Sequence, residues 1–212
     1  MTLAEEIVLL TLDEASGTTR GRQGLAASLA LAGAVMMDLS LHGRVDTDRD
    51  TLLLPSGAPT GEAVLDDALL ALSLDPPRDS RAALLLLARD GEKRRAMVLD
   101  GLVARGFLRR DRGSILRLFS TRYPANDSGV AVAEVRTRLR ALVMGDDIPE
   151  PRDALLLSLA RATGLLPLVF SANELAAHQE RLALLARMEA LGRSLGETVA
   201  ELYATRLRAA GT

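Results

Sequence analysis

The chain has 212 residues, enough for one domain with a sizeable core, and 48% of them are hydrophobic, which excludes an intrinsically disordered protein. Aromatic residues make up only 2%, with no Trp and no Cys, so the core must consist of Leu, Ala and Val. This favours helices over a β-sandwich and excludes disulfides and thiolate metal sites. The net charge of −2 averages over three unlike segments of the chain.

The sequence contains no recognisable secretory signal or membrane span. The first six residues include two acidic and no basic side chains. The longest apolar stretch without charge, residues 25–37, is shorter than the roughly 18 residues that a membrane span requires. We therefore expect a cytoplasmic protein whose contact with a membrane is peripheral.

The spacing of apolar residues predicts a mainly α, single globular domain over residues 1–212, with two short β-hairpins. Pro76 and Pro77 are expected to end one helix, and Gly106 to close another. Helices are predicted over residues 3–12, 24–41, 81–87, 92–105, 130–143, 151–163, 175–191 and 195–207, with a further one between Thr60 and Pro76. The hairpins are predicted to place residues 45 and 52–54 around a turn at 46–50, and residues 107–109 and 115–119 around a turn at 111–114.

Residues 56–69 have the pattern of a turn that leads into a helix. Gly57 and Pro59 mark the turn, and Thr60 is expected to cap the free N–H groups of the first helical turn. Glu62 then places a negative charge at the positive end of the helix dipole. One apolar face is predicted for this helix, formed by Val64, Leu65, Ala68, Leu69 and Leu72.

Residues 89–122 form a basic block, with a net charge of +6 from ten basic and four acidic side chains. Residues 1–88 carry −7 and residues 123–212 carry −1. A concentrated basic block suggests an anionic partner, which is a phospholipid headgroup, a nucleic acid or an acidic protein. The alternative interpretation is a solvated charged surface without a partner.

Few residues have a pattern typical of catalysis or metal binding. His42 and His178 lack metal-ligand spacing, and Lys93 is the single lysine, outside any phosphate-binding loop. Neighbouring carboxylates on a helix do not share a face, so the three adjacent acidic pairs are poor candidates for acid–base catalysis. We interpret Glu5–Glu6 as charge at a helix start, Asp66–Asp67 as part of a solvent face and Asp146–Asp147 as part of a loop. We expect no enzyme activity, no metal and no cofactor.

The basic block also has the outline of a winged helix, in which a DNA-reading helix is followed by two strands around a basic turn. Lys93, Arg94 and Arg95 lie on the predicted helix, and Arg109 and Arg110 lie on the hairpin after it. The acidic overall charge and the lack of an obvious dimerisation helix argue against this motif. Nucleic-acid binding therefore stays an alternative that we do not favour.

The turn segment Ala58-Pro59-Thr60-Gly61 is followed by a Leu-Asp-Asp-Ala-Leu run at residues 65–69. Four further segments are residues 3–10, residues 33–44 with His42-Gly43-Arg44 at the end, residues 102–108 and residues 152–160. Taken in the order in which they occur along the chain, the five segments resemble the Golgi phosphoprotein 3 family of peripheral membrane proteins. Members of that family read phosphatidylinositol 4-phosphate on cytoplasmic membrane faces. The Arg- and Ala-rich composition resembles that of bacterial, in particular actinobacterial, members.

The resemblance implies a mostly helical domain with a positively charged face against the membrane. It also implies a headgroup pocket, which eukaryotic members form from one Trp and three Arg. The corresponding positions in this chain are Gln23, Ala32, Glu92 and Arg95. Arg95 is therefore the position that matches, and four basic residues lie near enough in sequence to substitute for the others. They are Arg20, Arg22, Lys93 and Arg94.

The candidate headgroup-binding residues are Arg95, Arg94, Arg22 and Gln23. Because the loop before the second helix has no Trp, membrane binding is expected to be more electrostatic and more sensitive to salt. The favoured hypothesis is a non-catalytic peripheral protein on the inner face of a membrane, which binds phosphatidylinositol 4-phosphate or another anionic phospholipid. Membrane-protein tails are further candidate partners. The alternatives are a protein-interaction scaffold that has lost the lipid pocket and a winged-helix DNA-binding protein; the oligomeric state is left open.

Overall fold

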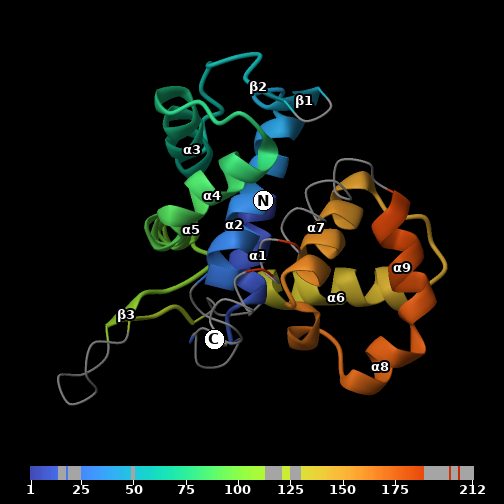
Figure 1. Ribbon diagram of the computed structural model, residues 1–212. Helices are drawn as coiled ribbons and strands as arrows, with labels where there is room; N and C mark the ends of the chain where they lie inside the picture. Colours follow the sequence, from blue (N-terminus) through green and yellow to red (C-terminus); the bar gives the residue numbers. More distant parts are fainter. Residues whose placement is uncertain are drawn as a thin grey trace.

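A computed structural model describes residues 1–13, 18, 25–48, 51–112, 121–124, 130–188, 201 and 205 of the chain. These residues form a mainly α-helical fold with two antiparallel hairpins, as predicted. The helices α1 and α2 lie at the centre, with α3–α5 on one side and α6–α9 on the other (Figure 1). The helices are α1 (Leu3–Leu10), α2 (Leu25–Leu41), α3 (Ala63–Leu74), α4 (Ser80–Arg89), α5 (Gly91–Ala104), α6 (Val130–Met144), α7 (Pro151–Ala162), α8 (Ala172–Ala177) and α9 (Gln179–Met188), with a 3-10 turn η1 (Leu166–Leu168).

All eight residues of α1 are buried, and the helix packs against α2, α5, α6 and α7. Its first turn is closed by a capping box between Thr2 and Glu5. The Thr2 hydroxyl accepts the Glu5 N–H at 3.1 Å, and the Glu5 carboxylate accepts the Thr2 N–H at 2.9 Å. The helix is therefore central although it is only two turns long.

The buried helix α1 carries two carboxylates, Glu5 and Glu6, which are 4% and 2% exposed. Arg105 at the end of α5 donates to Glu5. Glu6 pairs with Arg138 of α6 at 2.6 Å and with Arg152 of α7 at 3.2 Å. The sequence interpretation of this pair as a helix-start charge was therefore incomplete, because the two acids also join α1 to three helices.

Asp38 connects α2 to the start of α1. Its two carboxylate oxygens accept the backbone N–H groups of Leu3 and Ala4, each at 2.9 Å. The side chain is 1% exposed, and burial raises the pKa of Asp38 to about 6, although these hydrogen bonds and Arg152 act in the opposite direction. An acid 35 residues away thus satisfies helix N–H groups that would otherwise lack partners.

The apolar face predicted for α3 is confirmed, since all five of its residues are buried. The predicted cap is wrong: α3 begins at Ala63, Glu62 is its N-cap residue, and no side chain caps it. Thr60 is two residues too early in the chain to act as the cap, and its hydroxyl bonds to Asp66 at 2.7 Å. The C-terminal prediction for α5 is confirmed, because Gly106 adopts a φ of 77° just beyond the C-cap.

Two hairpins are present, as predicted, but their strands are shifted from the predicted positions. Residues 46–48 were predicted in the first turn and form a strand instead, whereas Val45 precedes that strand. Strands β1 (Asp46–Asp48) and β2 (Thr51–Leu53) pair with Thr47 opposite Leu52. Strands β3 (Asp111–Arg112) and β4 (Thr121–Arg122) pair with Asp111 opposite Arg122. Asp111 was predicted in the turn, so the second hairpin begins later than expected, and its predicted second strand at 115–119 lies outside the described residues.

The helix predicted over residues 175–191 is divided into α8 and α9. Ser171 and Glu174 form a capping box that starts α8 earlier than predicted, and His178 ends it with non-helical backbone angles. Its ring Nδ1 lies 2.9 Å from the Glu174 carbonyl oxygen. Of the last predicted helix, residues 195–207, the structure describes residues 201 and 205, and both are helical.

Helix α5 approaches α2 closely at Gly91. A Cβ atom at this position would lie 2.3 Å from Ser28 Oγ and 3.0 Å from Ser28 Cα. Gly101, further along the same helix, has no atom within 4 Å of such a Cβ. The absence of a side chain at Gly91 therefore determines how near α5 sits to α2.

The change Gly91→Ala is expected to lower the free energy of unfolding by about 1–3 kcal/mol, because the added methyl group overlaps Ser28. Gly101→Ala on the same helix is the matched control, and it should raise the free energy of unfolding by about 0.5–1 kcal/mol. Urea unfolding followed by circular dichroism measures both. Equal stability of the two variants would contradict the close approach.

The pH dependence of stability should contain a contribution from Asp38. Its folded pKa of about 6 lies above the ordinary 3.8, so its contribution is complete below about pH 4 and is lost as the pH rises to about 6. The free energy of unfolding of the wild type, measured relative to that of Asp38→Asn, should therefore fall by up to roughly 3 kcal/mol as the pH rises across that window. Unfolding titrations at a series of pH values measure this difference, and a constant difference would refute the assignment.

Candidate functional site

Two segments of the sequence resemblance form one structural unit. Arg44 Nε donates to the Ala58 carbonyl oxygen at 2.7 Å, and its Nη1 donates to the His42 carbonyl oxygen at 2.9 Å. Asp66 holds the same turn from α3, because its Oδ1 accepts the Thr60 N–H at 2.6 Å. Burial opposes ionisation of Asp66, but the hydrogen bonds from Thr60 and Gly61 lower its pKa overall. The turn is thus held by Arg44, which follows α2, and by Asp66 of α3.

Asp67, the next residue, points to α5 instead of to solvent. Its Oδ2 lies 3.1 Å from Arg94 Nε, and its Oδ1 accepts from Lys93 Nζ at 2.5 Å. Arg94 is 1% exposed and also donates from Nη1 to the Leu87 carbonyl oxygen at 2.7 Å. The interpretation of the Asp66–Asp67 pair as a solvent face is therefore wrong, since both side chains have internal partners.

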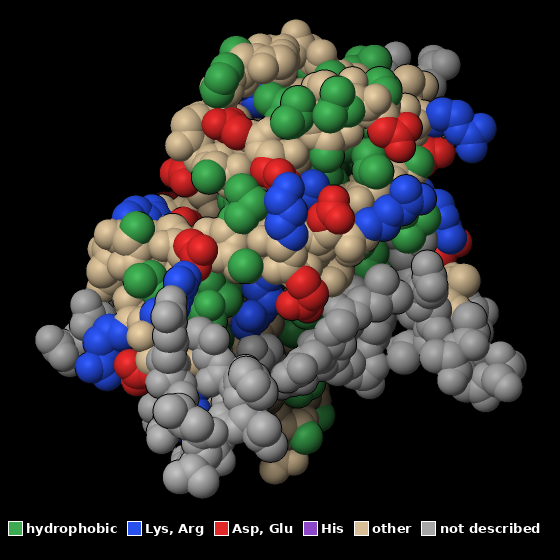
Figure 2. Space-filling view, turned by 90° about the vertical axis from the view of Figure 1, so that its left-hand side faces the viewer, with side chains coloured by type: hydrophobic (Ala, Val, Ile, Leu, Met, Phe, Trp, Pro, Cys, Tyr) green, Lys and Arg blue, Asp and Glu red, His purple; other side chains and the backbone are tan. Residues whose placement is uncertain are grey.

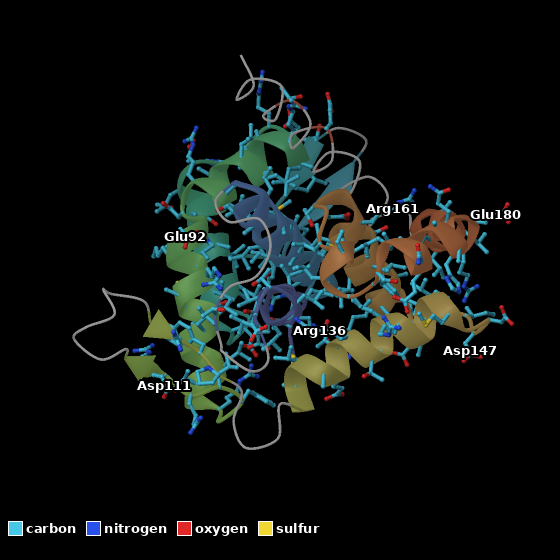
Figure 3. The ribbon with its side chains drawn as sticks, turned by 90° about the horizontal axis from the view of Figure 1, so that it is seen from below. Glu92, Asp111, Arg136, Asp147, Arg161 and Glu180 are labelled. Atoms are coloured by element: carbon cyan, nitrogen blue, oxygen red, sulfur yellow. The ribbon has the colours of Figure 1, made fainter. Side chains whose placement is uncertain are left out.

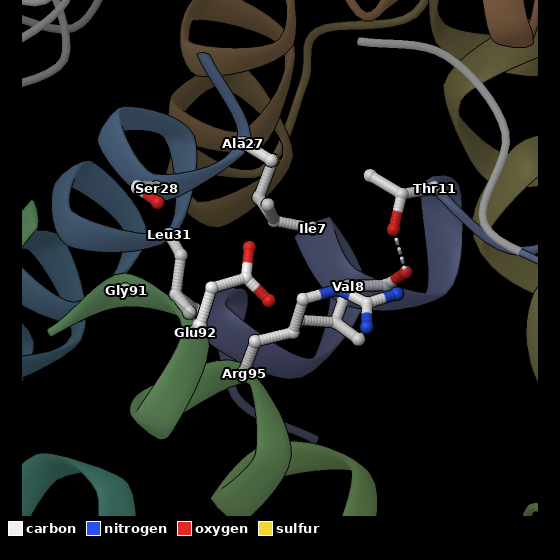
Figure 4. A pocket seen from close by; sticks show the side chains of 9 residues that line it. All are labelled: Ile7, Val8, Thr11, Ala27, Ser28, Leu31, Gly91, Glu92 and Arg95. Carbon is white, nitrogen blue, oxygen red and sulfur yellow. Dashed lines mark hydrogen bonds between the residues drawn. The ribbon is translucent and has the colours of Figure 1, made fainter. Parts of the chain in front are cut away.

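A small hollow lies where the start of α5 meets α1 and α2 (Figure 4). Arg95, from α5, is half-buried at its edge, and Figure 4 shows its guanidinium near Val8 and Thr11. The hollow has a volume of about 10 Å³, room for a single water molecule. Its lining consists of Ile7, Val8, Thr11, Ala27, Ser28, Leu31, Gly91, Glu92 and Arg95.

Burial lowers the pKa of Arg95, and Glu92 and Tyr123 offset part of that effect. The guanidinium remains charged at physiological pH because an arginine pKa is far above it. Figure 4 shows the Glu92 carboxylate inside the same hollow. A partly desolvated cation beside apolar walls is a local arrangement that can bind an oxyanion through charge-assisted hydrogen bonds.

The four candidate headgroup residues have different positions. Arg95 lines the hollow, whereas Arg94 is buried and has a structural role. Arg22 and Gln23 lie outside the described residues, as does Arg20. Of the other positions that the resemblance suggests, Glu92 lines the hollow beside Arg95, and Ala32 is buried at 2% exposure without lining it.

Within the described part of the chain, four of the ten basic residues in the basic block pair with acids, some of them distant in sequence. Lys93 and Arg94 pair with Asp67, Arg105 with Glu5, and Arg110 with Asp100. Figure 2 shows Lys and Arg side chains interspersed with Asp and Glu on the face that includes α3 and α5. The exposed positive charge is therefore smaller than the sequence count suggests.

The chain matches the family model of Golgi phosphoprotein 3 (GPP34) over residues 3–202. It belongs to the Golgi phosphoprotein 3 family. The match spans all five segments that suggested the family and extends from α1 beyond α9. None of the helices in the described part of this family member has the length and apolarity needed to cross a bilayer.

Sequence reasoning missed the two buried acid clusters, Glu5 with Glu6 and Asp67 with Arg94. Neighbouring acids on a helix point in different directions, and their partners are 26 or more residues away. An indication was nevertheless available: Glu5, Glu6 and Asp67 occur in segments that resemble the Golgi phosphoprotein 3 family. Acids in a family signature that lie outside any catalytic motif are candidates for structural ion pairs.

Replacement of Asp67 by Asn should lower the free energy of unfolding by roughly 1.5–3 kcal/mol, because it leaves the buried Arg94 charge with only the exposed carboxylate of Asp90, 3.9 Å away. The matched control is Asp100→Asn on α5, whose ion pair with Arg110 is at the surface and should change stability by less than about 0.5 kcal/mol. Urea unfolding at neutral pH distinguishes the two. Similar effects of both changes would contradict the structural role of Asp67.

Proposed function

We propose that this protein is a peripheral membrane protein that binds anionic phospholipid headgroups, phosphatidylinositol 4-phosphate among them, and has no catalytic role. The observation that carries the proposal is the position of Arg95, a partly buried cation in the hollow between α5, α1 and α2. In the sequence resemblance, Arg95 corresponds to one of the arginines of the family's headgroup pocket, which supports the proposal. Membership of the Golgi phosphoprotein 3 family supports the same function.

The small size of the hollow determines what kind of contact we propose. A volume of about 10 Å³ is too small to enclose a sugar phosphate, so a lipid phosphate would rest over Arg95 instead of entering a deep pocket. A single charge-assisted hydrogen bond contributes roughly 1.5–3 kcal/mol. Binding should therefore be modest, dependent on several lipids at once, and weakened by salt.

We place the protein on the cytoplasmic face of the membrane, where anionic lipids attract basic surfaces. Membrane-protein tails are further candidate partners in this proposal. Surface charge on the face with α3 and α5 is mixed, as Figure 2 shows. A mixed face binds an anionic bilayer through local cations such as Arg95 rather than through a uniform positive field.

The burial of Arg94 favours a second candidate function, a protein-interaction scaffold that does not bind lipid. Lys93 and Arg94 are both engaged by Asp67, which removes two of the cations that could have formed a pocket. The same engagement weakens the winged-helix alternative, since a DNA-reading helix needs its cations at the surface. A lipid-binding protein should bind anionic vesicles and a scaffold should not, so vesicle binding distinguishes these two functions.

Co-sedimentation with vesicles tests the proposal. Neutral phosphatidylcholine vesicles are compared with vesicles that also contain phosphatidylinositol 4-phosphate or phosphatidylglycerol, at low and at high salt. The wild type should bind both anionic vesicles at low salt, and Arg95→Ala should weaken binding about tenfold, equivalent to roughly 1.4 kcal/mol.

Arg109→Ala is the charge-matched control, because Arg109 is exposed and belongs to the same basic block. It should weaken binding less than Arg95→Ala does. If both variants lose the same amount of vesicle binding, the protein is held by general electrostatic attraction and Arg95 is not a specific site. If no anionic vesicle binds the wild type at low salt, the lipid proposal fails and the scaffold becomes the better explanation; a shift with duplex DNA under those conditions would favour the winged helix.

A further inference from the structure

A second and larger hollow lies between α4 and the segment that joins it to α3. Its volume is about 290 Å³, near the lower limit of small-ligand sites and suited to a headgroup. The walls include Pro77, Leu85 and Leu86, and the charged side chains are Asp75, Arg78 and Arg89. This hollow shares no lining residue with the one at Arg95.

The two arginines of this hollow are exposed, and within the described part of the chain neither has an ion pair or side-chain hydrogen bond. Their backbone is well held: the Arg78 carbonyl accepts the Leu52 N–H at 3.2 Å, and Asp79 caps α4 by accepting the Ala82 N–H at 2.7 Å. Two cations against one acid, Asp75, leave the hollow positive. The backbone at Arg78 is thus held, and the exposed side chains of Arg78 and Arg89 are available for a ligand, unlike that of Arg94.

Exposed leucines lead directly to this hollow. Leu70 and Leu74 of α3 are 58% and 76% exposed, and their spacing of four residues puts them on one side of the helix. Leu74 is followed at once by Asp75 of the rim. Figure 2 shows hydrophobic side chains gathered in the upper part of the face where α3 lies. Solvent-exposed leucines next to unpaired arginines are typical of surfaces that enter a membrane interface.

We infer that Leu70, Leu74, Arg78 and Arg89, here called the α3–α4 edge, form a membrane contact of their own. Arg78 and Arg89 bind the phosphate of one anionic lipid in the 290 Å³ hollow, while Leu70 and Leu74 enter the boundary between headgroups and acyl chains. This inference rests on the proposed function, because it concerns the same membrane. It adds apolar anchors, which the segment before α2 lacks in sequence.

The α3–α4 edge is close to the first hollow along the chain. Arg89 lines one hollow and Gly91 lines the other, and two consecutive Cα–Cα steps span at most about 7.6 Å. The joint between α4 and α5 is therefore the common boundary of both hollows. When both hollows meet the same membrane, the first lipid contact keeps the second at a high effective concentration.

The chain contains no Trp, so Leu74→Trp introduces a single fluorescent reporter at the α3–α4 edge. Ile148→Trp is the control, since Ile148 is 84% exposed and Figure 3 shows its neighbour Asp147 on the opposite side of the molecule from Glu92. With phosphatidylglycerol vesicles, Trp emission at position 74 should shift to shorter wavelength and be quenched by brominated acyl chains. Emission at position 148 should do neither.

The paired change Arg78→Ala with Arg89→Ala should weaken vesicle binding about twenty-fivefold, since each arginine near an anionic surface contributes about fivefold. If Trp at position 74 stays unquenched on bound protein and this double variant binds like the wild type, the edge inference fails while the proposed function stands. If the wild type binds no anionic vesicle, both fail. A concentration-dependent shift without vesicles, with dimers in light scattering, would instead assign the edge to self-association and overturn the inference.

Discussion

The fold depends on two carboxylates that are buried in a two-turn helix. Charges removed from water are costly unless they have close partners, and Glu5 and Glu6 have theirs in Arg105, Arg138 and Arg152. These arginines come from the end of α5, from α6 and from α7, so α1 can occupy the centre only when all three helices are in place. The hollow at Arg95, which α1 lines with α5 and α2, is one consequence.

The same requirement divides the arginines into two groups. Those that neutralise interior acids, such as Arg94 and Arg138, stabilise the packing and are lost as binding groups. Those that meet no acid, such as Arg78 and Arg89, remain at the surface among the described residues. A segment can therefore be rich in arginine because buried acids elsewhere in the fold need ion-pair partners, and not only because the segment binds an anion. The basic block at residues 89–122 is an example.

Features that depend on near neighbours in the chain could be predicted from the sequence. The buried face of α3 and the role of Gly106 follow from helical period and backbone conformation, and both are as expected. The partners of Glu5 were not predicted, because Arg105 lies 100 residues away in the chain and no local pattern encodes that contact. The hydrogen bond of Thr60 to Asp66 and the helix break at His178 were also missed, although their partners are near neighbours in the chain. The candidate site was likewise predicted only in part. Arg95 was identified by resemblance, whereas the burial of Arg94 could not be predicted because it depends on packing against Asp67.

The turn and helix start at residues 58–69 position this site without lining it. Asp66 anchors the turn before α3, and Asp67 fixes Arg94 on the side of α5 that faces α3 and α4. Successive residues of a helix point about 100° apart, so an Arg94 held toward Asp67 directs Arg95 to another side of α5. That side faces α1 and α2, where the hollow lies. Asp67 thus helps to set the orientation of α5, and through it the direction in which Arg95 presents its charge.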